Sequence, residues 1–171
     1  DEDFIRDLAR QAYYDVPACA LGMPEVSVSI YPKNGRQRIV EILLSYPLER
    51  PELEKRLEEL DGILGELARE LEGWPDLPAA AARTLLELGE YSPQGGSAVN
   101  SLFDSGEADS EGLALAYAAL SQRLKLPCQV AQGTLDGEIR FWNVVQTETG
   151  WRHIDLAAMG QAEDGENDPL Y

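Results

Sequence analysis

Few residues of this chain could carry out nucleophilic or acid–base chemistry. The thiols are Cys19 and Cys128, and the imidazole is His153. His153 lies two residues before Asp155, so in a strand both side chains would point to one face, where a carboxylate can orient a proton-accepting imidazole. Cys128 follows Pro127 at the start of an apolar segment, which predicts a buried and unreactive thiol. The sequence leaves open whether the two cysteines pair.

Metal and phosphate sites are not predicted. The chain has one histidine and no C-x-x-C spacing, so we expect neither a metal site nor a cofactor. The carboxylates of Asp164, Glu166 and Asp168 could bind calcium, but their spacing misses the EF-hand pattern, and a solvated acidic tail is expected instead. Gly95-Gly96 is not followed by a lysine and does not predict a phosphate-binding loop.

Composition limits the classes of partner. The chain has 171 residues, 44% of them hydrophobic, which suits one domain with a core of its own. Its net charge of −17 repels phosphate backbones and anionic membrane surfaces, so we do not expect nucleic-acid binding. No stretch approaches the roughly 20 apolar residues of a membrane helix, so membrane insertion of this segment is not expected. Because the sequence begins at Asp1 rather than Met, we expect a fragment of a longer protein.

The elements that must position the candidate residues begin with a helix and a hairpin. Apolar residues at helical spacing predict a helix over residues 3–14. Alternating apolar residues predict strands over 26–30 and 39–46, joined through Asn34-Gly35, a pair that favours a tight turn.

Two further helices precede the segment with the candidate site. A leucine stripe predicts a core-facing helix from Pro51 to Gly73. The stripe consists of Leu53, Leu57, Leu60, Leu64, Leu67 and Leu71. A second helix is expected over 78–89, then a loop over 91–96 and a short helix over 97–103.

The last third of the chain predicts one helix followed by an antiparallel meander. Asp109 can cap a helix that runs to about residue 125. One face of this helix is formed by Leu113, Ala116, Tyr117, Leu120 and Leu124. Three strands are expected near 128–134, 138–146 and 151–156. Because strands and helices do not alternate regularly along the chain, the pattern indicates an α+β fold.

Five short phrases occur in order between Ser97 and Ala157. They are Ser110-Glu111-Gly112-Leu113, Leu126-Pro127-Cys128, Gly133, Arg140-Phe141-Trp142-Asn143 and Trp151-Arg152-His153-Ile154-Asp155. Together they resemble the core of the transglutaminase-like superfamily, especially its bacterial members. In that family a cysteine begins a helix, and strands reading His-x-Trp-Asn and Trp-Tyr-His-Val-Asp follow. The resemblance covers about a third of the chain. It implies a transglutaminase-like (papain-like cysteine protease) fold, with a helix packed on an antiparallel sheet.

The resemblance also assigns catalytic positions, and two of the three hold unsuitable residues. The nucleophile falls on Ser110, the base on Arg140 and the orienting acid on Asp155. A serine hydroxyl has almost no anionic fraction at neutral pH, and arginine has no acceptor with which to take a proton. We therefore expect neither transglutaminase nor cysteine protease activity. In place of the catalytic histidine–aspartate bond we expect a direct Arg140–Asp155 ion pair, at paired positions on neighbouring strands.

The leading functional interpretation is a non-catalytic transglutaminase-like module. It would be a binding or structural unit of a larger bacterial protein, extracellular or on the cell surface, with a cytoplasmic location left open. The former active-site cleft would hold a peptide, protein or glycan near Trp142 and Trp151, or would be closed by its own side chains. The expected parts are an N-terminal helical and β-hairpin region (1–90), the core (91–160) and an acidic tail (161–171).

The alternative is an enzyme. It would be a hydrolase acting on peptide or amide bonds through Ser110, with His153 as the base and Asp155 as the orienting acid. A hydrogen bond between Ser110 and His153 would favour this alternative, because a serine nucleophile needs an adjacent base.

Overall fold

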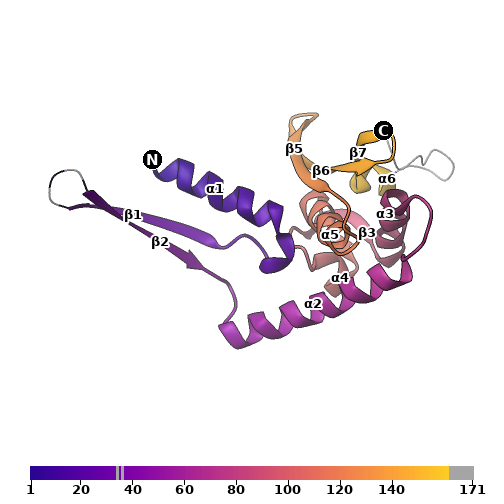
Figure 1. The fold of residues 1–171 in the computed structure, drawn as a ribbon, viewed down its shortest axis with the longest axis horizontal. Helices are drawn as coiled ribbons and strands as arrows, with labels where there is room; N and C mark the ends of the chain where they lie inside the picture. The colour runs from indigo at the N-terminus through magenta and orange to yellow at the C-terminus, as the bar shows by residue number, and fades with distance from the viewer. Residues whose placement is uncertain (34, 36, 162–171) are drawn as a thin grey trace.

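The computed structural model describes residues 1–33, 35 and 37–161, and Figure 1 shows it as a ribbon. Helices and strands are mixed, which confirms the α+β class. The helices are α1 (Glu2–Asp15), α2 (Arg50–Glu70), α3 (Leu77–Leu88), α4 (Ser101–Ser105), α5 (Ser110–Arg123) and α6 (Leu156–Gln161), with a 3-10 turn over Pro17–Cys19. The strands are β1 (Glu25–Lys33), β2 (Gln37–Ser45), β3 (Glu90–Gly96), β4 (Glu107–Ala108), β5 (Cys128–Leu135), β6 (Glu138–Thr147) and β7 (Gly150–Ile154).

Helix α5 lies at the centre of the fold (Figure 1). It begins where the sequence predicts, because the Asp109 carboxylate accepts a hydrogen bond from the Gly112 N–H at 2.8 Å and caps the first turn. All residues from 112 to 121 are buried. A helix that is covered on all sides is a core helix, and α5 contacts the three-stranded sheet as well as α2 and α3.

The sheet that packs on α5 is the predicted meander, with strand order β5-β6-β7 and antiparallel pairing throughout. Side chains alternate between its two faces. On β6, Asn143 and Val145 are buried, and the Asn143 Nδ2 donates to the Ala114 carbonyl oxygen of α5 at 2.9 Å. Arg140 and Trp142 therefore occupy the opposite face of the same strand.

Helices α2 and α3 complete the core around α5. The leucine stripe of α2 faces inward as predicted, with Leu60, Leu64 and Leu67 buried. The Tyr117 hydroxyl of α5 donates to the carbonyl oxygen of Pro78 at 3.0 Å, which ties α5 to the start of α3. No helix in the described part of the chain is long and apolar enough to cross a membrane.

Strands β1 and β2 form a hairpin that projects away from the other elements, with α1 running alongside it (Figure 1). The two strands are longer than predicted and pair from Glu25↔Ser45 to Lys33↔Gln37. The predicted turn residue Asn34 lies outside the described residues. Phe4 and Leu8, which belong to the apolar pattern of the first helix, are 62% and 54% exposed, so that pattern does not mark a fully buried face.

Three local expectations differ from the structure. The segment over 91–96, expected as a loop, belongs to β3, which pairs in parallel with the two-residue strand β4. The short helix expected over 97–103 begins later, as α4 at Ser101. The last strand ends at Ile154 and is followed by α6, which sequence reasoning missed. The expected acidic tail lies outside the described residues, except for Gln161 at the end of α6.

Candidate functional site

Ser110 stands at the first turn of the central helix, where the resemblance puts the nucleophile. Its side chain is 9% exposed, and its Oγ accepts a hydrogen bond from the backbone N–H of Phe141 on β6 at 3.3 Å. That donor is a main-chain amide, which cannot accept the hydroxyl proton. The arrangement fixes α5 to β6 but provides no base for the Ser110 hydroxyl.

Arg140 and Asp155 form the predicted ion pair. The Arg140 Nε lies 3.3 Å from Asp155 Oδ2, and the Arg140 Nη2 lies 3.3 Å from Asp155 Oδ1. The two side chains are 14% and 21% exposed, so the pair is largely shielded from water. The guanidinium also lies over the ring of Tyr91 on β3, 5.5 Å from its centroid. Two hydrogen bonds and an aromatic face therefore hold Arg140.

The expected placement of this pair on the sheet is wrong in one respect. Arg140 pairs with Gly133 on β5, and β7 ends at Ile154, opposite Asn143. Asp155 is thus the first residue beyond β7 rather than a paired strand residue. There its Oδ1 also accepts a hydrogen bond from the Ala158 N–H at 2.9 Å, in the manner of a helix cap, at the start of α6.

His153 has a different partner from the one the enzyme interpretation requires. It is exposed, and its Nδ1 accepts a hydrogen bond from the Trp142 indole N–H at 2.9 Å. Trp142 in turn lies against Gly133, where an added Cβ would come within 2.7 Å of the ring. The contacts of Trp142 therefore favour a packing role in the sheet, and among the described hydrogen bonds none joins His153 to Ser110 or to Asp155.

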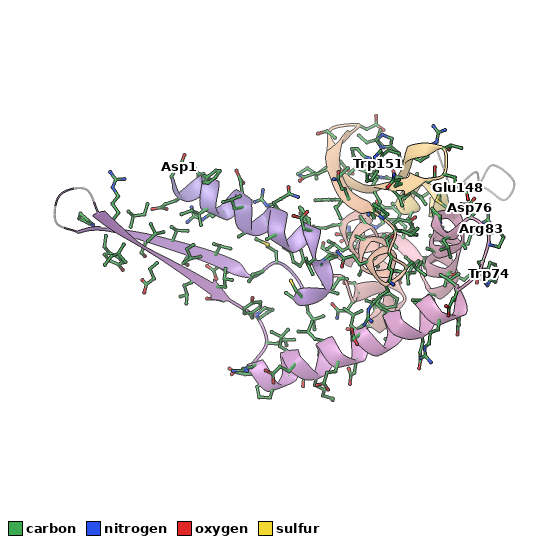
Figure 2. The ribbon with its side chains drawn as sticks, viewed as in Figure 1. Asp1, Trp74, Asp76, Arg83, Glu148 and Trp151 are labelled. Carbon is green, nitrogen blue, oxygen red and sulfur yellow. The ribbon has the colours of Figure 1, made fainter. Side chains whose placement is uncertain are left out.

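A cavity of about 500 Å³ opens beside Ser110. It is lined by Arg10, Tyr14, Asp109, Ser110, Glu111, Gln132, Ile139 and Phe141. A neighbouring cavity of about 300 Å³ shares three of these residues and continues between α1 and β5 to Asp7, Gln11 and Val130. The cleft is therefore open, and its wall comes partly from α1. Trp142 and Trp151 are not among its lining residues, and Trp151 is half-exposed on β7 (Figure 2).

The charged groups of this cavity influence one another. The Tyr14 hydroxyl donates to Glu111 Oε1 at 3.0 Å. Burial raises the pKa of Glu111 above its usual value, against the opposing effect of the Tyr14 hydrogen bond, and the nearby Asp109 raises it further. The pKa of Tyr14 is also raised, first by burial and then by the Glu111 charge. Glu111 is thus a carboxylate held in a partly dry wall beside Ser110.

Glu111→Gln should stabilise the fold at neutral pH. Because the pKa of Glu111 is raised in the folded state, ionising this carboxyl destabilises the wild-type fold. The wild type keeps its full stability below the unfolded pKa of about 4.3 and loses part of it as the pH rises through the folded pKa. Glutamine removes the charge and keeps an oxygen for Tyr14. Urea unfolding should show a gain in free energy of unfolding at neutral pH that shrinks as the pH falls towards the unfolded pKa. The exposed Glu107→Gln serves as the control, and a gain independent of pH would contradict the assignment.

The cysteines take no part in this cavity. Both are free, which answers the question of pairing. Burial raises the pKa of the Cys128 thiol to about 11, so this thiol is protonated at neutral pH. Its neighbour is the Asn143 side-chain amide, whose Nδ2 lies 3.6 Å from Sγ. Among the described residues, no three His, Cys, Asp or Glu side chains lie close enough together to hold a metal ion.

Sequence reasoning predicted the Arg140–Asp155 ion pair but missed the α1 side of the cavity. Arg10 and Tyr14 are one helical turn apart, and both line the cavity about a hundred residues away in sequence from Ser110. Residues four apart on a helix share a face, so the sequence indicates that these two act on one side of α1. It gives no sign that this side faces Ser110.

Comparison with known proteins identifies the fold. No protein-family model matches the chain, and no curated protein matches it. A solved transglutaminase structure superposes with a TM-score of 0.55 at 17% identity, covering 98% of this chain and 50% of that one. A Cytophaga hutchinsonii protein described as a candidate cysteine protease gives a TM-score of 0.48 at 13% identity, covering 78% of this chain and 62% of that one.

A third similar structure is the periplasmic domain of TgpA from Pseudomonas aeruginosa bound to ethylmercury. Its TM-score is 0.47 at 19% identity, covering 70% of this chain and 56% of that one. The present chain spans about half the length of the solved transglutaminase. The match to that transglutaminase extends over nearly the whole chain, and it confirms the fold expected from the phrases between Ser97 and Ala157. The chain has a transglutaminase-like fold.

Proposed function

We propose that this chain is a non-catalytic transglutaminase-like module that binds a peptide in the cavity beside Ser110. The observation that carries the proposal is the pairing of the three triad positions. Ser110 Oγ accepts the Phe141 N–H, while Arg140 and Asp155 hold each other. Among the described hydrogen bonds, none joins the Ser110 hydroxyl to a side chain that could accept its proton, and the cavity next to it stays open.

Peptide binding fits the chemistry of the cavity wall better than glycan binding. The wall offers the Arg10 guanidinium, the Glu111 carboxylate and the Gln132 amide, together with the rings of Tyr14 and Phe141, which pack edge to face. Groups of both charges, together with a neutral amide, match the N–H, C=O and charged groups of a polypeptide. The two tryptophans proposed as ligand contacts lie outside this wall, so they do not support a stacked sugar there.

Gln132→Trp should block peptide binding. Gln132 is exposed and lines both cavities, so a bulky ring there fills the groove without disturbing the core. Peptides selected by phage display on the wild-type protein should bind it in calorimetry and lose at least about tenfold in affinity with the variant. Gln129→Trp is the matched control, since Gln129 is exposed on the same strand and lines neither cavity. Failure to select any peptide that distinguishes the two variants would contradict the proposal.

Catalytic turnover should be absent. We expect only background rates for amine incorporation into a glutamine peptide and for casein hydrolysis, because Arg140 has no acceptor and the His153 Nδ1 is taken by Trp142. The rates should be the same for the wild type and Ser110→Ala. Turnover that disappears in Ser110→Ala would overturn the proposal and support the alternative, a hydrolase that acts through Ser110.

The setting of the module is part of the same proposal. The resemblance implies a unit of a larger bacterial protein, outside the cytoplasm. The chain spans about half of the solved transglutaminase, which fits a module within a larger protein.

A further inference from the structure

One face of the β1–β2 hairpin is wholly apolar along its middle. The register pairs Val26 with Leu44, Val28 with Ile42, and Ile30 with Val40, so these six side chains share a face. The β1 half is covered, with Val28 only 9% exposed, because α1 lies against it and the Arg6 Nε donates to the Val26 carbonyl oxygen. The β2 half is not covered. Val40, Ile42 and Leu44 are 46%, 52% and 43% exposed.

The opposite face of the hairpin is mixed. It pairs Ser27 with Leu43, Ser29 with Glu41, and Tyr31 with Ile39, and the Tyr31 hydroxyl donates to Glu41. A face that alternates polar and apolar residues is ordinary for a solvated strand, whereas three large aliphatic side chains in a row are not. A two-stranded hairpin is marginally stable by itself, so the bare half of the apolar face calls for a covering element.

Helix α1 presents apolar side chains that its own hairpin does not cover. Ile5, Ala9 and Tyr13 are half-buried or buried and mark its inner side. Phe4 and Leu8, one turn apart, are 62% and 54% exposed on an adjoining side. The molecule therefore has two uncovered apolar surfaces, one on strand β2 and one on helix α1, and each could cover the other in a pair of molecules.

We propose that a second copy of this chain covers both at once, in a two-fold symmetric dimer. Each α1 would lie between its own β1 and the β2 of the second copy, so that Phe4 and Leu8 meet Val40, Ile42 and Leu44. In a two-fold interface the same surface serves both partners, and a surface with both halves of a complementary pair satisfies this requirement. The proposal is independent of the peptide cavity.

Charge favours a second copy as the occupant. Residues 25–45 hold two acidic and three basic residues, a net charge of +1. Since the whole chain has a net charge of −17, the remainder has a net charge of −18. Helix α1 is acidic at its start, where Asp1 is the cap and Glu2 and Asp3 lie in the first turn. Figure 2 shows Asp1 at the end of the helix that runs along the hairpin. A weakly basic hairpin is attracted to this acidic helix in another copy. An anionic membrane would attract the hairpin but repel the rest of the molecule.

Adjacent residues on β2 supply the test. Sedimentation velocity over a wide concentration range should show a dimer for the wild type. Ile42→Asp should weaken dimerisation at least about tenfold, because it puts a carboxylate on the apolar face. Leu43→Asp is the matched control, since Leu43 is 60% exposed on the opposite face and its change should leave the dimer intact. Phe4→Asp, on the reciprocal element, should act like Ile42→Asp.

Three outcomes would overturn the proposal. The first is a wild-type protein that stays monomeric at every concentration. The second is a dimer lost in Leu43→Asp and retained in Ile42→Asp, which would assign the interface to the other face. The third is a monomer that sediments with phosphatidylserine vesicles and loses this property in Ile42→Asp, which would assign the face to a membrane. All three aspartate variants change exposed residues, and circular dichroism should show that they fold.

Discussion

Gly112→Ala should destabilise the protein by about 1–3 kcal/mol, the usual cost of forcing extra atoms into a filled space. An added Cβ at Gly112 would lie 2.4 Å from the Gly96 carbonyl oxygen and 3.1 Å from the Ala108 Cβ. The nearest neighbour is backbone of β3, which cannot rotate away as a flexible side chain could. The first turn of α5 would have to move off β3, taking Ser110 with it.

A second helical glycine provides the control for this prediction. Gly62 lies in α2, is exposed, and would have no atom within 4 Å of an added Cβ. Gly62→Ala should therefore stabilise the protein by about 0.4–1 kcal/mol through the entropy of the unfolded chain. Urea unfolding of both variants measures the contrast. Equal stability of Gly112→Ala and wild type would mean that α5 does not approach β3 as closely as described.

Arg140→Ala should destabilise the protein by about 1–3 kcal/mol. The change removes two hydrogen bonds from Asp155, whose side chain is only 21% exposed, and leaves its carboxylate without a cation. The remaining contact of Asp155, with the Ala158 N–H, preserves the start of α6 but does not balance the charge. Arg140→Lys keeps the charge and loses the paired geometry, so its effect should lie between those of wild type and alanine.

The control for Arg140 is an arginine on the neighbouring strand. Arg152 on β7 is exposed, and its Nη2 donates to Thr149 at 3.4 Å. Arg152→Ala should change the free energy of unfolding by no more than about 0.5 kcal/mol, as is usual for surface substitutions. If chemical denaturation showed the same small change for Arg140→Ala, the ion pair would contribute nothing beyond an exposed contact.

The elements around α5 could be predicted because their signals are local. Asp109 caps the helix through a residue three positions away, and the apolar spacing from Leu113 onward needs no knowledge of the fold. The turns at Asp136-Gly137 and Gly150 separate the strands, and positive φ values of 53°, 86° and 116° occur at these three residues. The Arg140–Asp155 pair could be predicted because the resemblance fixes which residues meet.

What could not be predicted depends on contacts distant in sequence. The segment of β3 contains Pro93, Gly95 and Gly96 and has no alternating apolar pattern, so only its pairing with β4 makes it a strand. An added Cβ at Gly95 would come within 2.6 Å of Ala108 backbone, which shows how closely the two segments lie. Helix α6 has six residues, too few for a periodic signal. The cavity wall supplied by α1 could not be predicted either, because it depends on contacts between Tyr14 and residues about a hundred positions away.

The two bonds of Asp155 affect how sequences of this kind should be interpreted. Its carboxylate both receives the Arg140 guanidinium and caps α6 through the Ala158 N–H. The second contact does not depend on which residue occupies position 140, so an aspartate here has a folding role even where no proton is transferred. The acid in the final phrase is therefore weak evidence of an active enzyme, because its role at the start of α6 is enough to account for it.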